Sequence, residues 1–477
     1  MDRGIVRINK INIKNLKNVG NGDITFSEKI CENFYDQKSD ILGIYGQNGS
    51  GKTTVIYALY TLKNLLIGNR LDNDFENYIK ANKEKSTAKF ELEIMNVQKQ
   101  KFKCIYEFEI KKAVQEDKNT DFFSLPEQID FESSIYISME RLCISRLKEK
   151  GWTRMTPVLE YFEEEEKPVV PNKNYHKLTN GKKEIEDEVR FEKLFSKRMS
   201  KSFIFSPKMQ NIIFKSSLDE EVKEIFKMIN MYATYKLHVI SNIETGAINA
   251  NIGFPIAFVS SHKDSMTMLK GRLNLNGTSQ IPEEHYKIIA KNIETSNTVL
   301  KEIIPHLSIS LQKTGTNLDE NNEKIIVAEL IANRGDVKIP LKYESDGIKK
   351  LVSILYMLIM VYNDPSMTLA VDEFDSGIFE HLLGEILSII EKFGKGQLIF
   401  TSHNLRPLEV INKNNILFTT TNEENRYIKF KNLKANHNFR NMYFHDIILG
   451  GQSEVMYEIT SPHRIRHAFS IAGDNNG

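Results

Sequence analysis

The stretch "GQNGSGKTT", Gly46 to Thr54, lies between an apolar run, "SDILGIY", and an amphipathic run, "KTTVIYALYTLKNLL". Its glycines, lysine and threonines have the spacing of a phosphate-binding loop. Glycines let backbone N–H groups come close to phosphate oxygens, and a helix that follows turns its positive end toward the same anion. We therefore predict a buried strand that ends in this loop, followed by a helix.

Two side chains of the loop have tasks of their own. Lys52 is predicted to reach the β- and γ-phosphates of a nucleotide, and Thr53 to offer its hydroxyl to Mg²⁺. The alternative is a chance glycine-rich turn, which we disfavour because the pattern and the flanking elements agree. The residues expected to bind the nucleotide here are Gly46, Asn48, Gly49, Ser50, Gly51, Lys52, Thr53 and Thr54.

A second stretch, "TLAVDEFDSG", reads as a short buried strand that delivers two acids to its end. Asp372 is predicted to hold Mg²⁺, and Glu373 to orient or deprotonate an attacking water molecule. Two solvated acids at a strand end are common, and that interpretation would be favoured for this stretch alone. The phosphate-binding loop upstream reverses the preference.

A third stretch, "GQLIFTSHN", is another apolar strand, and it ends at His403. A histidine at this place can hydrogen-bond a γ-phosphate and so sense whether it is present. The alternative is a histidine that is simply satisfied in a loop. The series of three strand ends favours the functional interpretation.

The stretch "KYESDGIKKLVSIL", Lys342 to Leu355, has two interpretations. Ser345 is a favoured residue to cap the helix that follows. A helix start with serine and glycine also binds phosphate well, so Ser345 and Gly347 could contact a nucleotide held by another subunit. We predict that the stretch does both, with Ser345 as a cap and Ser345 and Gly347 as phosphate-binding residues.

Composition bounds the class of protein. The chain has 477 residues and a formal net charge of +1, whereas nucleic-acid binders usually carry a clear basic excess. The three cysteines lack metal-ligand spacing and read as reduced thiols. No signal peptide is evident, and the longest apolar run, Leu351 to Tyr362, is too short to span a bilayer. These features predict a cytoplasmic protein without a membrane partner.

Alternation of strands and helices predicts an α/β fold with a mixed or parallel sheet core, an antiparallel β subdomain and a helical insertion. We expect an N-terminal lobe over 1–150 and a mostly helical insertion over 151–303. Within the insertion, the polar segment Phe162 to Glu188 is expected to be an exposed, mobile loop. A C-terminal lobe over 304–425 and an extension over 426–477 follow.

The order of loop, insertion, Ser-x-Gly helix start, Asp-Glu strand and His strand resembles the ABC-type ATPases, specifically their branch with SMC, RecF and OLD proteins. "INIKNLKNV" is similar to that branch's N-terminal strand and turn, which places Lys17 among the nucleotide-binding residues. The whole pattern resembles the ATPase subunits of bacterial anti-phage systems of the PARIS and Septu types. The motifs cover 1–70 and 340–420, and we expect no fused TOPRIM nuclease.

This resemblance implies an ATP- and Mg²⁺-dependent ATPase that forms ADP and phosphate. It implies a head-to-tail homodimer, or a larger homo-oligomer, in which Ser345 and Gly347 act in trans. It also implies a switch that controls a separate nuclease or toxin effector in anti-phage defence. The main alternative is a RecF- or SMC-like repair ATPase that binds DNA, and a transporter's nucleotide-binding subunit fits less well.

The chain departs from the family pattern at two places. The signature is Ser345-Asp346-Gly347 instead of Ser-Gly-Gly, and the added aspartate would repel a phosphate unless it turns away or pairs with Lys349 or Lys350. The glutamine loop that links the two lobes has no clear match, and Gln210 is the candidate for it.

Overall fold

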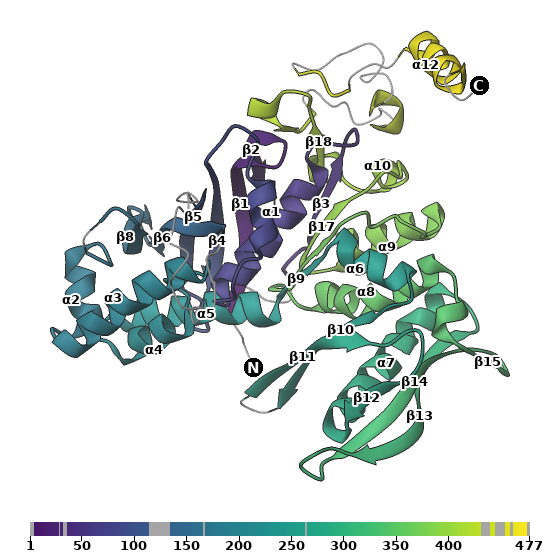
Figure 1. Cartoon of the computed structure of the whole chain (residues 1–477), viewed down its shortest axis with the longest axis horizontal. Coiled ribbons are helices and arrows are strands. Elements are labelled where there is room, and N and C mark those ends of the chain that lie inside the picture. The colour runs from purple at the N-terminus through teal and green to yellow at the C-terminus, as the bar shows by residue number, and fades with distance from the viewer. Residues whose placement is uncertain are drawn as a thin grey trace, which may run out of the picture.

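The computed structural model describes residues 4–27, 29–31, 36–113, 134–165, 167–262, 265–430, 439–443, 454–457 and 461–474. Two large sheets organise these residues (Figure 1). One sheet is antiparallel and N-terminal, and the other is mostly parallel and collects strands from the whole chain.

The antiparallel sheet has the order β2-β1-β4-β5-β6-β7, with β8 also paired to β6. The predicted inward residues Ile8, Ile11 and Ile13 are all buried, so the alternating pattern identified this sheet correctly. A register shift lies between Ile8 and Lys10. Its strands are β1 (Ile5–Leu16), β2 (Val19–Thr25), β4 (Lys85–Met95), β5 (Lys101–Lys112), β6 (Ile135–Lys148), β7 (Gly151–Trp152) and β8 (Thr156–Phe162).

The second sheet has the order β19-β18-β3-β17-β16-β9 and is parallel from β18 to β9. The predicted α/β core is therefore present. Because parallel strands share one carboxyl edge, the loops after β3, β16 and β17 meet at the same place. Its strands are β3 (Asp40–Tyr45), β9 (Leu237–Ile240), β16 (Thr368–Val371), β17 (Gln397–Thr401), β18 (Ile416–Thr419) and β19 (Tyr427–Ile428).

Helices cover both faces of this sheet. On one face α1 (Lys52–Leu66) packs in the same core as the antiparallel sheet, through residues such as Leu59 and Leu62. On the other face α8 (Asp346–Asn363) and α9 (Glu380–Phe393) share a second core with Ile41 and Leu398. The phosphate-loop helix and the Ser345 helix thus lie on opposite faces of one sheet. A short helix, α10 (Pro407–Val410), follows β17.

The segment Phe162 to Glu188 differs from the predicted mobile loop. It contains α2 (Asn172–Thr179) and the first turns of α3 (Lys183–Arg198). The few apolar residues of this polar segment, among them Val169 and Leu178, are buried in the main core and anchor it. High average polarity therefore concealed a short buried stripe. Helices α4 (Pro207–Lys215) and α5 (Glu220–Tyr235) complete this layer.

The predicted helical insertion also contains strands. Strand β9 joins the parallel sheet beside β16, and a hairpin of β10 and β11 and strand β12 follow. Strand β9 is only four residues long, so its own periodicity could not identify it. It is defined as a strand by its parallel pairing with β16. The elements of this arm are α6 (Asn242–Asn249), β10 (Phe254–His262), β11 (Ser265–Leu273), β12 (Ser279–Pro282), α7 (Glu283–Ile303), β13 (Leu307–Leu318), β14 (Lys324–Arg334) and β15 (Val337–Pro340).

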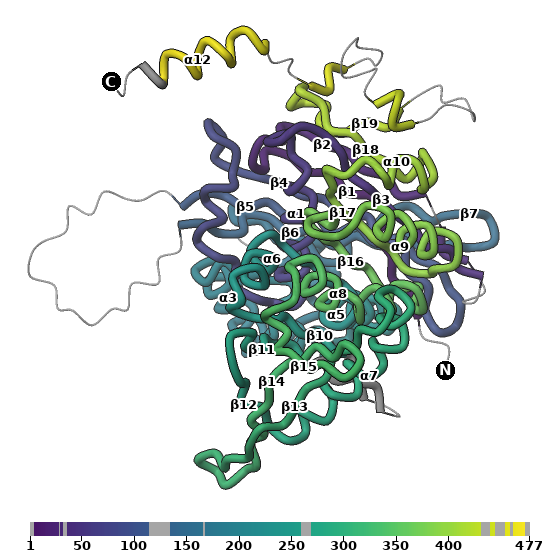
Figure 2. Tube along the Cα trace, turned by 90° about the vertical axis from the view of Figure 1, so that its right-hand side faces the viewer, coloured from purple at the N-terminus to yellow at the C-terminus, as the bar shows by residue number. Residues whose placement is uncertain are grey.

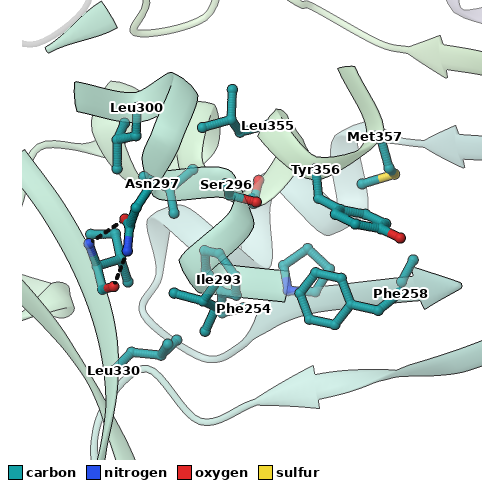
Figure 3. Close-up of a pocket in the computed structure, with 15 residues that line it drawn as sticks. Phe254, Phe258, Ile293, Ser296, Asn297, Leu300, Leu330, Leu355, Tyr356 and Met357 are labelled. Atoms are coloured by element: carbon teal, nitrogen blue, oxygen red, sulfur yellow. Dashed lines mark hydrogen bonds between the residues drawn. The ribbon is translucent and has the colours of Figure 1, made fainter. Parts of the chain in front are cut away.

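An apolar interface joins the arm to α8. Figure 3 shows side chains of Phe254, Ile293, Leu300 and Tyr356 around a pocket between β10, α7 and α8. Its cavity is about 20 Å³, room for about one water molecule. Asn297 ties α7 to Ile309 of β13 through two hydrogen bonds of 2.8 Å. The apolar residues around the pocket therefore join the arm to the helix that begins at the Ser345 stretch, while Asn297 holds two elements of the arm together.

The remaining elements are short or peripheral. Figure 2 shows α12 (Pro462–Asp474) standing away from the body of the molecule. Within the described residues, no helix is long and apolar enough to cross a membrane. The short 3-10 helices are η2 (Asn73–Tyr78), η3 (Leu341–Tyr343), η4 (Lys413–Asn415) and η5 (Glu423–Asn425).

Candidate functional site

The glycine loop connects β3 to α1, and its backbone explains its glycines. Gly46 has a φ of 152°, and a Cβ there would lie 1.6 Å from the Thr419 hydroxyl oxygen. Gly49 and Gly51 have φ values of 76° and 100°, which favour glycine. The loop therefore adopts a conformation that residues with a side chain rarely take, which lets an anion come close to its backbone N–H groups.

Lys52 folds back over this loop. Its Nζ donates hydrogen bonds to the carbonyl oxygens of Gly46 at 2.8 Å and Gln47 at 3.1 Å. Burial lowers the pKa of Lys52, while the charges of Asp372 and Glu373 act in the opposite direction. The ammonium group is thus desolvated and faces two acids across the site. Because it is poorly hydrated, it would attract an anion in the cavity strongly.

An open cavity of about 470 Å³ lies at the carboxyl edge of the parallel sheet. It brings together the loop, both predicted acids and the predicted histidine. Among the predicted site residues, Gly46, Ser345 and Gly347 do not line it. The lining residues are Lys17, Asn18, Asn48, Gly49, Ser50, Gly51, Lys52, Thr53, Thr54, Asp372, Glu373, Thr401 and His403.

Asp372 has the surroundings of a metal ligand. Its Oδ1 accepts hydrogen bonds from the hydroxyls of Thr401 at 2.6 Å and Thr53 at 3.3 Å. Its Oδ2 is buried and has no hydrogen-bond partner within the described residues. A buried carboxylate oxygen without a partner is costly, and a hard cation that also takes a hydroxyl ligand would satisfy it. The pair Thr53 and Asp372 therefore fits Mg²⁺.

Glu373 stands in a strained backbone conformation. Its φ is 48°, the left-handed region that residues with a side chain rarely adopt. Its N–H donates to the Thr401 hydroxyl at 2.7 Å, and its carbonyl accepts from Lys350 Nζ. Its carboxylate accepts from the amide of Asn242 at 3.3 Å. These contacts direct the carboxylate of Glu373 to the cavity.

His403 lies exposed on the cavity wall, at the end of β17. Its backbone N–H and that of Asn404 donate to the Asp375 carboxylate at 3.1 and 2.9 Å. Asp375 follows Glu373 by two residues, so the turn after β16 holds the histidine loop in place. This side chain has the freedom to reach an anion in the cavity.

Lys17 contributes from the N-terminal sheet. Its ammonium group lies over the rings of Tyr57, 4.7 Å from the centroid, and Tyr78, at 4.4 Å. Burial lowers its pKa, and Asp372 opposes this effect. The Tyr427 hydroxyl donates to the Gly51 carbonyl at 2.8 Å, which pins the glycine loop against the same region.

The Ser345 stretch lies apart from this cavity. Ser345 caps α8, because its hydroxyl accepts from the N–H of Ile348 at 3.4 Å, and it is exposed. Asp346 pairs with Lys349 at 2.8 Å, as expected for one of the two neighbouring lysines. A Cβ on Gly347 would lie 1.8 Å from the carbonyl oxygen of Gly377. The start of α8 therefore packs directly on the turn that follows the two acids.

Sequence reasoning missed several side chains of this site. The structure does not bring Gln210, the candidate for the glutamine loop, to the cavity; its side-chain amide donates to the Phe205 carbonyl just before α4. Asn242, directly after β9, approaches Glu373 instead. Asn18 directly follows the predicted Lys17, and Thr401 lies two residues before the predicted His403, and this proximity was the signal for them in the sequence. The sequence around Lys350 contains no signal that places this lysine beside Glu373.

No family model matches the chain, and no curated protein matches its sequence. The solved structures similar to it include an SMC head domain with an extended coiled coil, bound to the C-terminal domain of ScpA, from Pyrococcus furiosus (11% identity, covering 93% of this chain and 100% of that chain, TM-score 0.37). They also include the SMC head domain from Thermotoga maritima (13% identity, covering 89% of this chain and 99% of that chain, TM-score 0.33). A third is the recombination mediator RecF with ATP (12% identity, covering 84% of this chain and 94% of that chain, TM-score 0.32). Since these TM-scores are low, the function of the site is inferred from its own geometry.

Proposed function

We propose that the protein is an ATPase of the ABC type, which binds ATP and Mg²⁺ in the cavity and forms ADP and phosphate. One observation carries this proposal: a phosphate-binding loop, a buried aspartate with an unpartnered oxygen, a glutamate and a histidine meet at one edge of a parallel sheet. This set of groups suits in-line attack of water on a γ-phosphate.

Each residue has a role in the proposed reaction. The loop N–H groups and Lys52 hold the phosphates, and Lys17 adds a second cation from the N-terminal turn. Thr53 and Asp372 would hold Mg²⁺, which when bound neutralises charge on the phosphate oxygens. Glu373 orients the attacking water and takes its proton, and His403 contacts the γ-phosphate.

Hydrolysis tests this proposal directly. We expect the wild-type protein to release phosphate from ATP in the presence of Mg²⁺ and to stop when EDTA removes the metal. Equilibrium dialysis with labelled ATP gives a second, independent readout of binding. Absence of both binding and phosphate release from the folded protein would refute the assignment.

We further propose that two copies pair head to tail, so that Ser345 and Gly347 of one copy contact the nucleotide of the other. The start of α8 supports this proposal, because Ser345 and Asp346 are exposed there and the N-terminal end of a helix attracts anions. The pairing of Asp346 with Lys349 lessens the repulsion of a phosphate. ATP should raise the solution mass of Glu373→Gln, and Ser345→Arg should abolish that rise.

By the resemblance of its motifs, the biological role we propose is control of a separate nuclease or toxin effector in bacterial anti-phage defence. Plaque counts test it in cells that carry this gene with its neighbours, with wild type compared with Glu373→Gln. Equal plaque counts in the presence and absence of the genes would argue against defence. Hydrolysis stimulated severalfold by DNA would favour the RecF- or SMC-like alternative.

A further inference from the structure

Lys350 is a buried lysine in the second turn of α8. Its side chain is among the largest that are fully buried, with a relative exposure of 1%. Its Nζ donates a hydrogen bond to the backbone carbonyl of Glu373. Since Gly347 also packs on Gly377, α8 contacts the turn after β16 on both sides of Asp375.

The backbone that Lys350 holds is the strained one. A non-glycine residue at a φ of 48° persists only where its surroundings fix it. Two hydrogen bonds do so at Glu373, one on each side of its Cα: the N–H donates to Thr401, and the carbonyl accepts from Lys350. Because the direction of the carboxylate depends on this backbone, loss of either bond would redirect it.

A charged side chain at this buried position is energetically unfavourable. Burial of an ammonium group is unfavourable. The neighbouring Lys349 is also buried, but it forms an ion pair with Asp346 at 2.8 Å, whereas Lys350 Nζ donates to the carbonyl of Glu373. Three acids, Asp372, Glu373 and Asp375, surround Lys350 and favour its charged form. The contact with the Glu373 backbone gives a reason for the lysine that packing alone does not.

We propose that Lys350 is a positioning residue for hydrolysis, which holds Glu373 in its left-handed conformation and so aims the carboxylate at the attacking water. This inference rests on the proposed role of Glu373. Since Lys350 lies on the helix that begins at Ser345, a displacement of the start of α8 is transmitted to Glu373 through this bond. Helix α8 is proposed to contact the nucleotide held by the partner copy. Through Lys350, the same helix would also set the reactivity of the site in its own chain.

Lys350→Met tests the proposal, because methionine keeps most of the volume but cannot donate a hydrogen bond. We expect kcat to fall about 100-fold, as misplacement of a catalytic group by about 1 Å does, with the Kd for ATP changed less than about threefold. Lys350→Arg keeps the charge and the donors, so it should recover part of kcat. A wild-type kcat in Lys350→Met would overturn the proposal.

Lys63→Met is the matched control. Lys63 is also a buried lysine whose Nζ donates to a backbone carbonyl, but this carbonyl is that of Leu237, at 2.5 Å, at the start of β9. Its loss should lower the melting temperature to a similar degree and leave kcat within about twofold of wild type, as expected for a site that lies away from the chemistry. Equal losses of kcat in the two variants would make Lys350 merely structural.

A crystal structure of Lys350→Met separates this inference from the proposed function. We expect Glu373 to leave the left-handed region once its carbonyl loses its partner. If wild-type protein hydrolyses no ATP, the proposed function fails, while the backbone of Glu373 still decides whether Lys350 positions it. An unchanged φ at Glu373 would refute the positioning role whatever the activity.

The pH profile gives a readout that a purely structural role would not move. Burial lowers the pKa of Lys350 to about 8, against the opposing charges of Asp375, Glu373 and Asp372, which also face Lys52. Lys350 therefore loses its charge as pH rises through about 8, and because a neutral amine still donates, its hydrogen bond to Glu373 weakens without being lost. The wild-type kcat/KM should fall as pH rises through 8, and Lys350→Arg should remove that part of the fall, because arginine stays protonated. Identical profiles would contradict the proposal.

Discussion

The two halves of the site are built in different ways. The phosphate-binding half is a continuous loop from Gly46 to Thr54, whose shape follows from its own glycines and the helix after it. The acid half, Asp372 and Glu373, depends on hydrogen bonds from Thr401, Asn242 and Lys350, which come from three distant segments.

This difference has a physical consequence. The loop offers backbone N–H groups, so its function depends on its conformation. The spacing of its residues in the sequence is therefore enough to predict most of its functional residues. The acids act through their side chains, so their function depends on partners that fix direction and charge. We therefore expect substitutions in the loop to act on binding, and substitutions in the acid half to act on the rate of reaction.

The largest effect is expected in the acid half, for Glu373→Gln. Glutamine keeps the shape but cannot take a proton, and general bases contribute about 10²- to 10⁴-fold to rate. We expect kcat to fall by this factor while the Kd for ATP stays close to wild type, measured by phosphate release and by equilibrium dialysis. Turnover at the wild-type rate would remove Glu373 from the role of base.

The loop half should respond in the opposite manner to Lys52→Ala. Hydrogen bonds to charged groups contribute about 1.5–3 kcal/mol each, so we expect the Kd for ATP to rise about 10- to 100-fold. Fold stability should not fall greatly, because the hydrogen bonds of its ammonium group go to the loop's own carbonyls, those of Gly46 and Gln47. Unchanged ATP affinity in dialysis would contradict the assignment of the phosphate-binding loop.

The same contrast explains which features could be predicted from the sequence. The spacing from Gly46 to Thr54 predicted a strand, a loop and a helix, and β3 and α1 occupy those places. Alternation in "INIKNL" predicted β1, because a half-buried strand shows its period directly. These features depend on residues that are close together in the chain.

What escaped prediction depends on distant contacts. Strand β9 is short and gains its hydrogen bonds from β16, far along the chain. Asn242 follows β9, so it could not be placed beside Glu373 until that pairing was known. Lys350 looked like one of two ordinary charges on a helix, and only the packing of α8 shows that it is buried. Sequence carries no local mark of such partners.

A smaller effect is expected when the support of the acid half is removed by Thr401→Val. The hydroxyl of Thr401 donates to Asp372 and accepts from the N–H of Glu373, and its loss leaves buried polar groups without partners. Each such group costs about 1–3 kcal/mol. We expect a lower melting temperature and a higher Mg²⁺ concentration at half-maximal hydrolysis.

Thr368→Val is the control for that experiment. Thr368 is buried at the other end of β16, and its hydroxyl donates to Gln397 and accepts from Tyr232. Its loss should destabilise the fold in the same way without changing the Mg²⁺ requirement. A shift of the Mg²⁺ requirement in both variants would mean that the effect comes from loosening of the sheet, not from Asp372.

The smallest effect on stability separates the two interpretations of the Ser345 stretch. The cap bond to Ile348 is long, at 3.4 Å, so Ser345→Ala should lower the free energy of unfolding by only about 0.5–1 kcal/mol in a denaturant titration. Aspartate caps helices as well as serine does, so Ser345→Asp should leave stability close to wild type. In trans, however, its charge would face the γ-phosphate of the partner's nucleotide and oppose assembly. In the Glu373→Gln background, loss of the ATP-driven mass increase in Ser345→Asp, with stability retained, would establish a contact in trans. An undiminished mass increase would leave Ser345 as a helix cap alone.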